Sequence, residues 1–163
     1  MARAAGRSGR AVSVVLRAVS GDDAAWNGGW LPAAAALVGY KGGGDAKCGR
    51  GKALATTRII ERDGERVGVL IYRLHTPKRG GGIIELIATP PEHARRGSGM
   101  KAAALVEDEL HAQGVREIYA PAPAAHGIAM YFWIRLGYRP LERAAWPCAR
   151  EGVVWLSLRL DER

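Results

Sequence analysis

The stretch from Ile83 to Met100 constrains the fold most, because its pattern specifies a strand, a turn and the start of a helix in one short segment. Ile83 to Ala88 is an apolar run that holds a single acid, Glu85. Such a run is typical of a largely buried strand with one polar residue. Pro90 and Pro91 follow it and predict its end, because proline cannot donate a hydrogen bond to a strand ladder.

A glycine-flanked helix start is predicted after this turn. Arg95 and Arg96 precede Gly97-Ser98-Gly99, and Lys101 to Gln113 has the composition of a helix, with Gly114 as a natural stop. The first backbone N–H groups of a helix lack partners within it and carry the positive end of its dipole, so the segment predicts an anion site that would suit a pyrophosphate. An ordinary strand-to-helix turn with solvated arginines is the alternative, because short glycine motifs also occur by chance.

Two motifs resemble those of the GCN5-related N-acetyltransferase (GNAT) family. Thr89 to Gly99 follows the family pattern in which Pro-Glu precedes a Gln or Arg and, two residues after that, Gly-x-Gly at a helix start; Ala94 stands at the Gln or Arg position. Ala129 to Tyr138 resembles the family's Ala-x-x-Phe-Tyr-x-x-x-Gly-Phe helix. The two motifs stand in the correct order and separation, which is more specific than either motif alone.

The resemblance implies an α/β fold in which helices flank a mixed, mostly antiparallel sheet and two parallel strands splay apart to admit CoA. It implies an acyltransferase that moves an acetyl group from acetyl-CoA directly to an amine in a ternary complex. The backbone of Ile87 to Thr89 would pair with the pantetheine amides like an added strand. The residues that the resemblance places at the cofactor are Ile87, Ala88, Thr89, Arg95, Arg96, Gly97, Ser98, Gly99, Met100, His126 and Trp133.

Glu85 matches the family position from which a carboxylate acts as general base, and its apolar surroundings favour that role. A salt-bridged or edge glutamate without a chemical role is the alternative. Trp133 stands where a tyrosine general acid is usual, and an indole N–H is not a donor of comparable acidity. Tyr131 or Tyr138 is then the candidate acid. Otherwise the thiolate leaves without one, another group supplies the proton, or the protein does not catalyse transfer.

Four further residues are placed by the resemblance near the cofactor or the acceptor. His126 stands where the family often has asparagine beside the pantetheine arm, and a helix-capping or surface role is equally open. Trp26, Trp30 and Tyr40 are candidates for the acceptor site. Packing against the sheet is the alternative that we favour for these three aromatic residues.

The rest of the pattern predicts a mixed α/β order, with a hairpin around the Asp-Gly turn at 63–64. Asp22 or Asp23 is expected to cap a short helix after Gly21, and Trp26 to Pro32 to form a turn. The expected strands are Val12–Val19, Thr56–Arg62, Arg66–Leu74, Val115–Ala120 and Val153–Leu160, and the other expected helices are Ala33–Tyr40 and Ile128–Leu136.

Composition places the chain with soluble globular proteins. Its 163 residues are 48% apolar and 25% charged, which fits a single domain at 11–163 after a disordered basic arm at 1–10. The arm also resembles a targeting peptide, but Arg17 interrupts the apolar stretch and favours a strand. No apolar run approaches a membrane span, and no metal-ligand spacing is present, so we expect neither a membrane partner nor a metal. Cys48 and Cys148 are expected to be free thiols of a cytoplasmic protein, with a bridge between them as the alternative.

The net charge of +8 and the pI near 10.0 predict attraction to anions. The Gly-rich basic segment 41–52 reads as a solvated loop, with contact to acceptor or nucleic acid as the alternative. An amine on a peptide, an aminoacyl-tRNA or a nucleic acid would suit this charge, whereas a polyamine or aminoglycoside is disfavoured by repulsion. A non-catalytic GNAT-fold module that binds nucleic acid or a partner protein is the second hypothesis. Monomer and homodimer are both compatible with the sequence.

Overall fold

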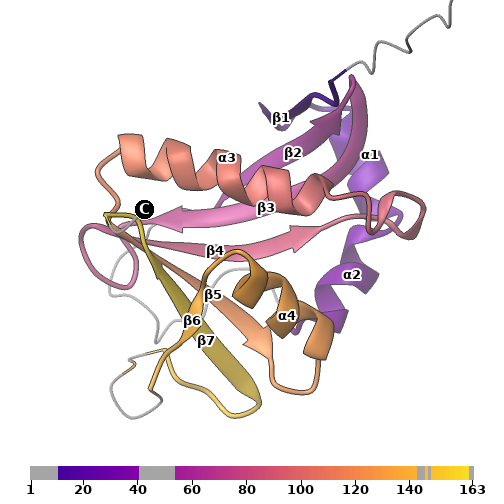
Figure 1. The fold of residues 1–163 in the computed structure, drawn as a ribbon. Coiled ribbons are helices and arrows are strands. Elements are labelled where there is room, and N and C mark those ends of the chain that lie inside the picture. The colour runs from indigo at the N-terminus through magenta and orange to yellow at the C-terminus, as the bar shows by residue number, and fades with distance from the viewer. Residues whose placement is uncertain (1–10, 41–53, 143–145, 147, 162–163) are drawn as a thin grey trace, which may run out of the picture.

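The computed structural model describes residues 11–40, 54–142, 146 and 148–161. In these residues seven strands form one sheet with the order β1-β2-β3-β4-β5-β7-β6, in which only β4 and β5 are parallel neighbours (Figure 1). The strands are β1 (Val14–Ala18), β2 (Thr56–Arg62), β3 (Glu65–Leu74), β4 (Gly81–Ala88), β5 (Glu117–Pro123), β6 (Arg139–Pro140) and β7 (Val153–Arg159). This is the mixed, mostly antiparallel sheet that the sequence predicted.

Helices cover both faces of the sheet. The helices are α1 (Asp23–Gly28), α2 (Leu31–Leu37), the short 3-10 helix η1 (Pro91–His93), α3 (Ser98–Ala112) and α4 (Gly127–Arg135). On one face, Ala102, Val106 and Leu110 of α3 pack with Trp133 of α4 in the larger core cluster. On the other face, α1 and α2 pack over a smaller cluster that includes Ala35 (Figure 1). None of the helices in the described part of the chain is long and apolar enough to cross a bilayer.

The hairpin predicted from the Asp-Gly turn is confirmed. Asp63 and Gly64 both have positive φ, at 52° and 85°, as a tight turn between twisted antiparallel strands requires. Successive side chains of a strand point to opposite faces, and the buried isoleucines Ile59 and Ile60 accordingly belong to different core clusters. The β-rich runs of the sequence are therefore strands that are covered on both sides.

The bounds of the amino-terminal helices differ from those predicted. Trp26 to Pro32 was expected to be a turn, but α1 continues to Gly28 and α2 begins at Leu31. Pro32 lies in the first turn of α2, where its missing N–H has no helical partner to lose. The turn is thus reduced to the two residues between the helices. The first predicted strand is confirmed as β1.

β5 extends further than predicted. Val115 to Ala120 was expected, but the strand runs to Pro123 and includes Pro121. Prolines are tolerated because β5 pairs with β4 only as far as Tyr119, so beyond that residue the β4 side of the strand needs no donors. The two-residue strand β6 was not predicted.

Cys148 is buried and disulfide-bonded, which contradicts the free thiol expected for it. The expectation of a reducing compartment rested on free thiols and loses that support. Three of the predicted features lie outside the described residues: Cys48, the basic arm at 1–10 and the segment 41–52. The described part of the chain after the arm contains β1, which begins at Val14.

Tyr138 and Glu107 form a buried polar pair in the core, and replacing Tyr138 with phenylalanine tests its contribution. The Tyr138 hydroxyl donates to Glu107 Oε1 at 3.0 Å, and both residues are 0% exposed. Removing this donor from a buried acceptor is expected to lower the free energy of unfolding by about 1–3 kcal/mol. Chemical denaturation measures the change. Tyr131→Phe is the control, because Tyr131 is 60% exposed. Equal effects of the two variants would contradict a role for the buried pair.

Candidate functional site

The parallel strands β4 and β5 splay apart. They pair at three positions, from Gly81 with Glu117 to Ile83 with Tyr119. Beyond these positions both strands continue, to Ala88 and Pro123, without pairing with each other. Pro121 and Pro123 have no N–H with which to extend the ladder. The structure therefore contains the splayed pair that the sequence resemblance implied, with the backbone of β4 available along one side of the gap.

The start of α3 lies beside the end of β4. Gly97 precedes the helix with φ +77°, a conformation that glycine adopts without strain, and no side chain caps the helix there. A Cβ added at Gly99 would lie 3.4 Å from Ile87 Cγ2 and 3.6 Å from the Phe132 ring. The first backbone N–H groups of α3 are thus near the strand end, in the place where an anion site was predicted.

Arginines surround this helix start. Arg95 and Arg96 are exposed, as an interaction with a bound anion requires. Arg62 Nη1 donates to the Arg96 carbonyl oxygen at 2.6 Å and lies 3.5 Å from Ser98 Oγ, which ties the loop to β2. Neither Arg62 nor Phe132 was predicted to be a site residue. Arg62 is 34 residues from Arg96, and no local pattern indicates that they meet.

Glu85 lies at a bulge in β4. Ile71 of β3 pairs with Leu86, and the next residue of β3, Tyr72, pairs with Ile84. β4 therefore has one extra residue at Glu85, and a bulge of this kind redirects the side chains around it. Ile84 belongs to the core cluster under α3, whereas Leu86 belongs to the cluster under α2.

Glu85 is paired with Arg73 of the neighbouring strand. Arg73 Nε lies 2.5 Å from Glu85 Oε1, and the two side chains are 14% and 10% exposed. The other carboxylate oxygen, Oε2, is buried and has no hydrogen-bond partner in the described part of the chain. The salt bridge considered as the alternative is therefore present, while the role of Glu85 as a base stays a prediction.

His126 begins α4. Its Nδ1 accepts a hydrogen bond from the backbone N–H of Ala129 at 3.1 Å, so the helix-capping interpretation is confirmed. A nitrogen that accepts this bond carries no proton, which leaves Nε2 as the donor of the neutral ring. The contact of His126 with a cofactor stays a prediction.

The three aromatic residues predicted as site residues in and after α4 lie in different surroundings. Trp133 is 5% exposed and packs against the rings of Phe132 and Tyr138, so its predicted cofactor contact gains no support. Tyr138 is committed to Glu107 in the core, and Tyr131 lies on the solvent side, where the Arg135 guanidinium is 5.7 Å from its ring centroid. The general-acid role of either tyrosine stays a prediction.

Trp26, Trp30 and Tyr40 pack against the core cluster under α1 and α2, as the favoured alternative predicted. The rings of Trp26 and Trp30 meet edge to face with centroids 5.1 Å apart. Tyr40 also lies near the site: burial raises the pKa of its phenol, and the negative charge of Glu85 raises it further. Of these three aromatic residues, Tyr40 is therefore the one that interacts with Glu85.

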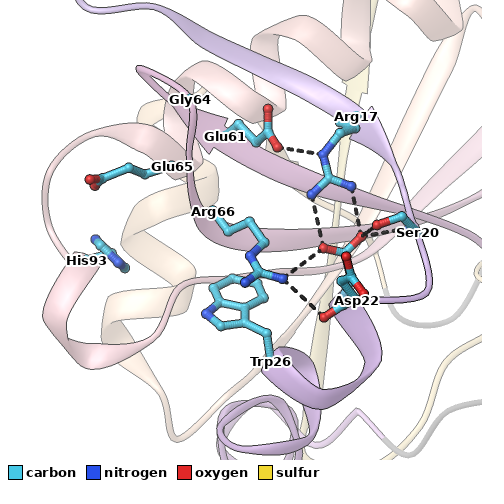
Figure 2. A pocket seen from close by; sticks show the side chains of 10 residues that line it. Arg17, Ser20, Asp22, Trp26, Glu61, Gly64, Glu65, Arg66 and His93 are labelled. Atoms are coloured by element: carbon cyan, nitrogen blue, oxygen red, sulfur yellow. Dashed lines mark hydrogen bonds and ion pairs between the residues drawn. The ribbon is translucent and has the colours of Figure 1, made fainter.

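A polar recess of about 550 Å³ lies between β1, α1 and the tip of the β2–β3 hairpin (Figure 2). Figure 2 shows the guanidinium groups of Arg17 and Arg66 converging on the segment that contains Ser20 and Asp22. The residues that line the recess are Arg17, Ser20, Asp22, Asp23, Trp26, Glu61, Gly64, Glu65, Arg66 and His93.

Asp23 is the centre of this recess. Asp22 stands at the N-cap position of α1, one of the two predicted, but its side chain makes no cap hydrogen bond. The Asp23 carboxylate is instead occupied by Arg17 at 2.8 and 3.0 Å and by the Ser20 N–H at 2.7 Å. Hydrogen bonds from Arg17 and then from Ser20 hold the pKa of Asp23 far below its ordinary value of 3.8. Asp23 is 1% exposed and joins β1, α1 and β3, so we interpret the cluster as structural.

Asp23→Asn is expected to make the protein less stable at neutral pH and to flatten its acid dependence. A carboxylate whose pKa is lower in the folded state stabilises that state fully above its unfolded pKa of 3.8 and loses the contribution as the pH falls below it. The stability difference between wild type and variant should therefore be constant at neutral pH and shrink below about pH 4. Urea denaturation from pH 7 to pH 3 measures this. A difference independent of pH would contradict the assignment.

The sequence of residues 35–138 matches the acetyltransferase (GNAT) family. The chain belongs to the GNAT family. No curated protein matches the sequence. Among solved structures, an acetyltransferase from Thermus thermophilus is similar with a TM-score of 0.67 and 20% identity, covering 91% of this chain and 97% of that one.

Two further GNAT-fold structures are similar. The ribosomal-protein-S18-alanine N-acetyltransferase from Escherichia coli has a TM-score of 0.59 and 17% identity, with 91% and 94% of the two chains covered. The PaiA N-acetyltransferase from Thermoplasma acidophilum, solved in complex with coenzyme A, has a TM-score of 0.55 and 10% identity, with 64% and 60% covered. Identities this low establish the shared fold, so the substrate has to be inferred from this chain's own residues.

Proposed function

We propose that the protein is an N-acetyltransferase that uses acetyl-CoA and transfers the acetyl group directly to an amine. The splayed β4–β5 pair beside the uncapped start of α3 carries this proposal. Ile87 and Ala88 pair with β3, and the side of the Ile87 to Thr89 backbone that faces the gap to β5 suits the amides of a pantetheine arm. The N–H groups of Ser98, Gly99 and Met100 suit a pyrophosphate. Arg95 and Arg96 supply positive charge, and His126 Nε2 is available to the arm.

Glu85 is the proposed general base. Its buried Oε2 has no partner in the described residues and would accept one proton of the ammonium group of the acceptor, directly or through a water. The amine nitrogen then forms a bond to the acetyl carbon while the carbon–sulfur bond breaks, and the second proton of the nitrogen goes to the leaving thiolate. No tyrosine acid is assigned, because thiols titrate near about pH 8.5 and the thiolate is a stable leaving group near neutral pH.

The test is thiol release from acetyl-CoA in the presence of an amine panel. The panel contains an acidic peptide with a free α-amine, an aminoacyl-tRNA, DNA with an amino-modified base, and a polyamine. Thiol release with one of the first three acceptors is the expected result, because the chain has a net charge of +8. Binding of acetyl-CoA without turnover, together with salt-sensitive binding of nucleic acid, would instead favour the non-catalytic module.

A further inference from the structure

The bulge in β4 brings Glu85 within reach of Arg73 on β3. Arg73 pairs with Ile83 in the sheet, two residues before Glu85 along β4. The extra residue at the bulge lets the two side chains meet, and Arg73 Nε contacts Glu85 Oε1 at 2.5 Å. The guanidinium group is planar and rigid, so a bond through Nε fixes the orientation of the carboxylate plane more firmly than a lysine ammonium would.

We propose that Arg73 is a positioning residue for the acetyl transfer, which holds Oε1 of Glu85 so that Oε2 is the atom that takes the proton. This inference rests on the proposed function. Carboxylate oxygens are acceptors with about four lone-pair positions between them, and buried acceptors are nearly always partnered. Oε2 has no partner in the described part of the chain although the side chain is only 10% exposed. Oε2 therefore keeps an acceptor position that no described residue fills, and the ammonium of an acceptor or a bridging water would fill it.

The other titratable groups near Glu85 do not provide the positive charge that Arg73 provides. Tyr40 follows α2 and lies near the carboxylate, but the pKa of its phenol is raised by burial and by Glu85, so it is neutral at pH 7. The Tyr40 hydroxyl interacts with the Glu85 carboxylate, which contributes to this raised pKa, but it does not form a hydrogen bond to Oε2. On β5, Glu117 and Tyr119 are tied to each other at 2.6 Å, and Lys78 contacts Glu117 at 3.1 Å. Arg73 is thus the cation that is hydrogen-bonded to Glu85 in the described residues, and removing it would leave a buried carboxylate without its counter-charge.

Arg73→Gln tests the proposal. We expect kcat to fall by about 100-fold at pH 7, because a reacting group that is displaced by about 1 Å loses that much rate. The KM for acetyl-CoA should not change. The acid limb of kcat/KM should move to higher pH, because a carboxylate that loses a neighbouring cation holds its proton more tightly. Arg73→Lys keeps the positive charge, so the acid limb of its kcat/KM profile should lie at the wild-type pH. Its kcat should stay below that of the wild type, because lysine lacks the planar guanidinium group.

Arg58→Gln is the matched control. Arg58 is a half-buried strand arginine paired with Glu109 at 3.3 Å, away from Glu85, and its loss should leave kcat and the pH profile unchanged. In a Glu85→Gln background, Arg73→Gln should cause no further loss, because a positioning residue has nothing left to position. Multiplicative losses in the double variant, or a uniform loss of rate at every pH, would overturn the proposal.

A second readout does not depend on turnover. Carbon NMR of the glutamate carboxyl groups follows the titration of Glu85, assigned by its absence in Glu85→Gln. In Arg73→Gln, and not in Arg58→Gln, the Glu85 signal should titrate at higher pH than in the wild type. An unchanged titration overturns the positioning role even in an active enzyme. If no amine of the panel causes thiol release, the proposed function is overturned. The NMR titration still tests whether Arg73 acts on the Glu85 carboxylate, because it needs no turnover.

Discussion

Replacing Glu85 with glutamine is expected to lower kcat by about 100- to 10,000-fold, the range that general acid–base catalysis contributes. Glutamine keeps the size of the side chain but cannot take a proton from the acceptor. The KM for acetyl-CoA should be unchanged, because cofactor binding is assigned to the end of β4 and the start of α3. Steady-state thiol release, measured with the acceptor that the panel identifies, gives both parameters.

The control for this variant is Glu109→Gln, which removes another glutamate that is paired with a strand arginine. It should turn over at the wild-type rate. At high pH the acceptor amine is uncharged without a base, so Glu85→Gln should recover part of its rate as the pH rises. A variant that is as active as wild type at neutral pH would show that Glu85 is only a salt-bridge partner of Arg73.

Gly99→Glu is expected to weaken acetyl-CoA binding by at least about 100-fold, equivalent to about 2.8 kcal/mol. The Cβ of the new side chain meets only ordinary contacts with Ile87 and Phe132, so the fold should accept it. Its carboxylate would lie in the first turn of α3, where helix N–H groups attract a negative charge. It would therefore compete with the pyrophosphate through both bulk and charge. Isothermal titration with acetyl-CoA measures the loss.

Gly99→Ala separates bulk from charge. The alanine Cβ occupies the same position without a carboxylate. The dissociation constant of acetyl-CoA from this variant should therefore stay within about 10-fold of the wild-type value, a difference below about 1.4 kcal/mol. Both variants should unfold at temperatures close to that of the wild type, because an acid in the first turn of a helix is slightly stabilising. Wild-type affinity in Gly99→Glu would place the pyrophosphate elsewhere.

Parts of the site could be predicted because their signals are local. The apolar run with one acid, the two prolines and the Gly-Ser-Gly segment specified β4, its end and the start of α3 within a few residues of one another. Pro121 and Pro123 are a further local signal: they lack the N–H groups that would extend pairing to β4. The strand predicted here ended at Ala120, whereas β5 continues to Pro123.

The sequence by itself determined β1 to β4, β7, the hairpin, α3 and the family, because side-chain alternation, helical periodicity and turn chemistry are properties of neighbouring residues. Only the tertiary structure decided which charges meet. The bulge at Glu85 is a matter of register between two strands, and its partner Arg73 is 12 residues away. The burial of Tyr138 and the exposure of Tyr131 depend on how α4 packs against the sheet. Such long-range contacts leave no periodic signal, since each depends on the placement of whole elements and on the loss of water around them.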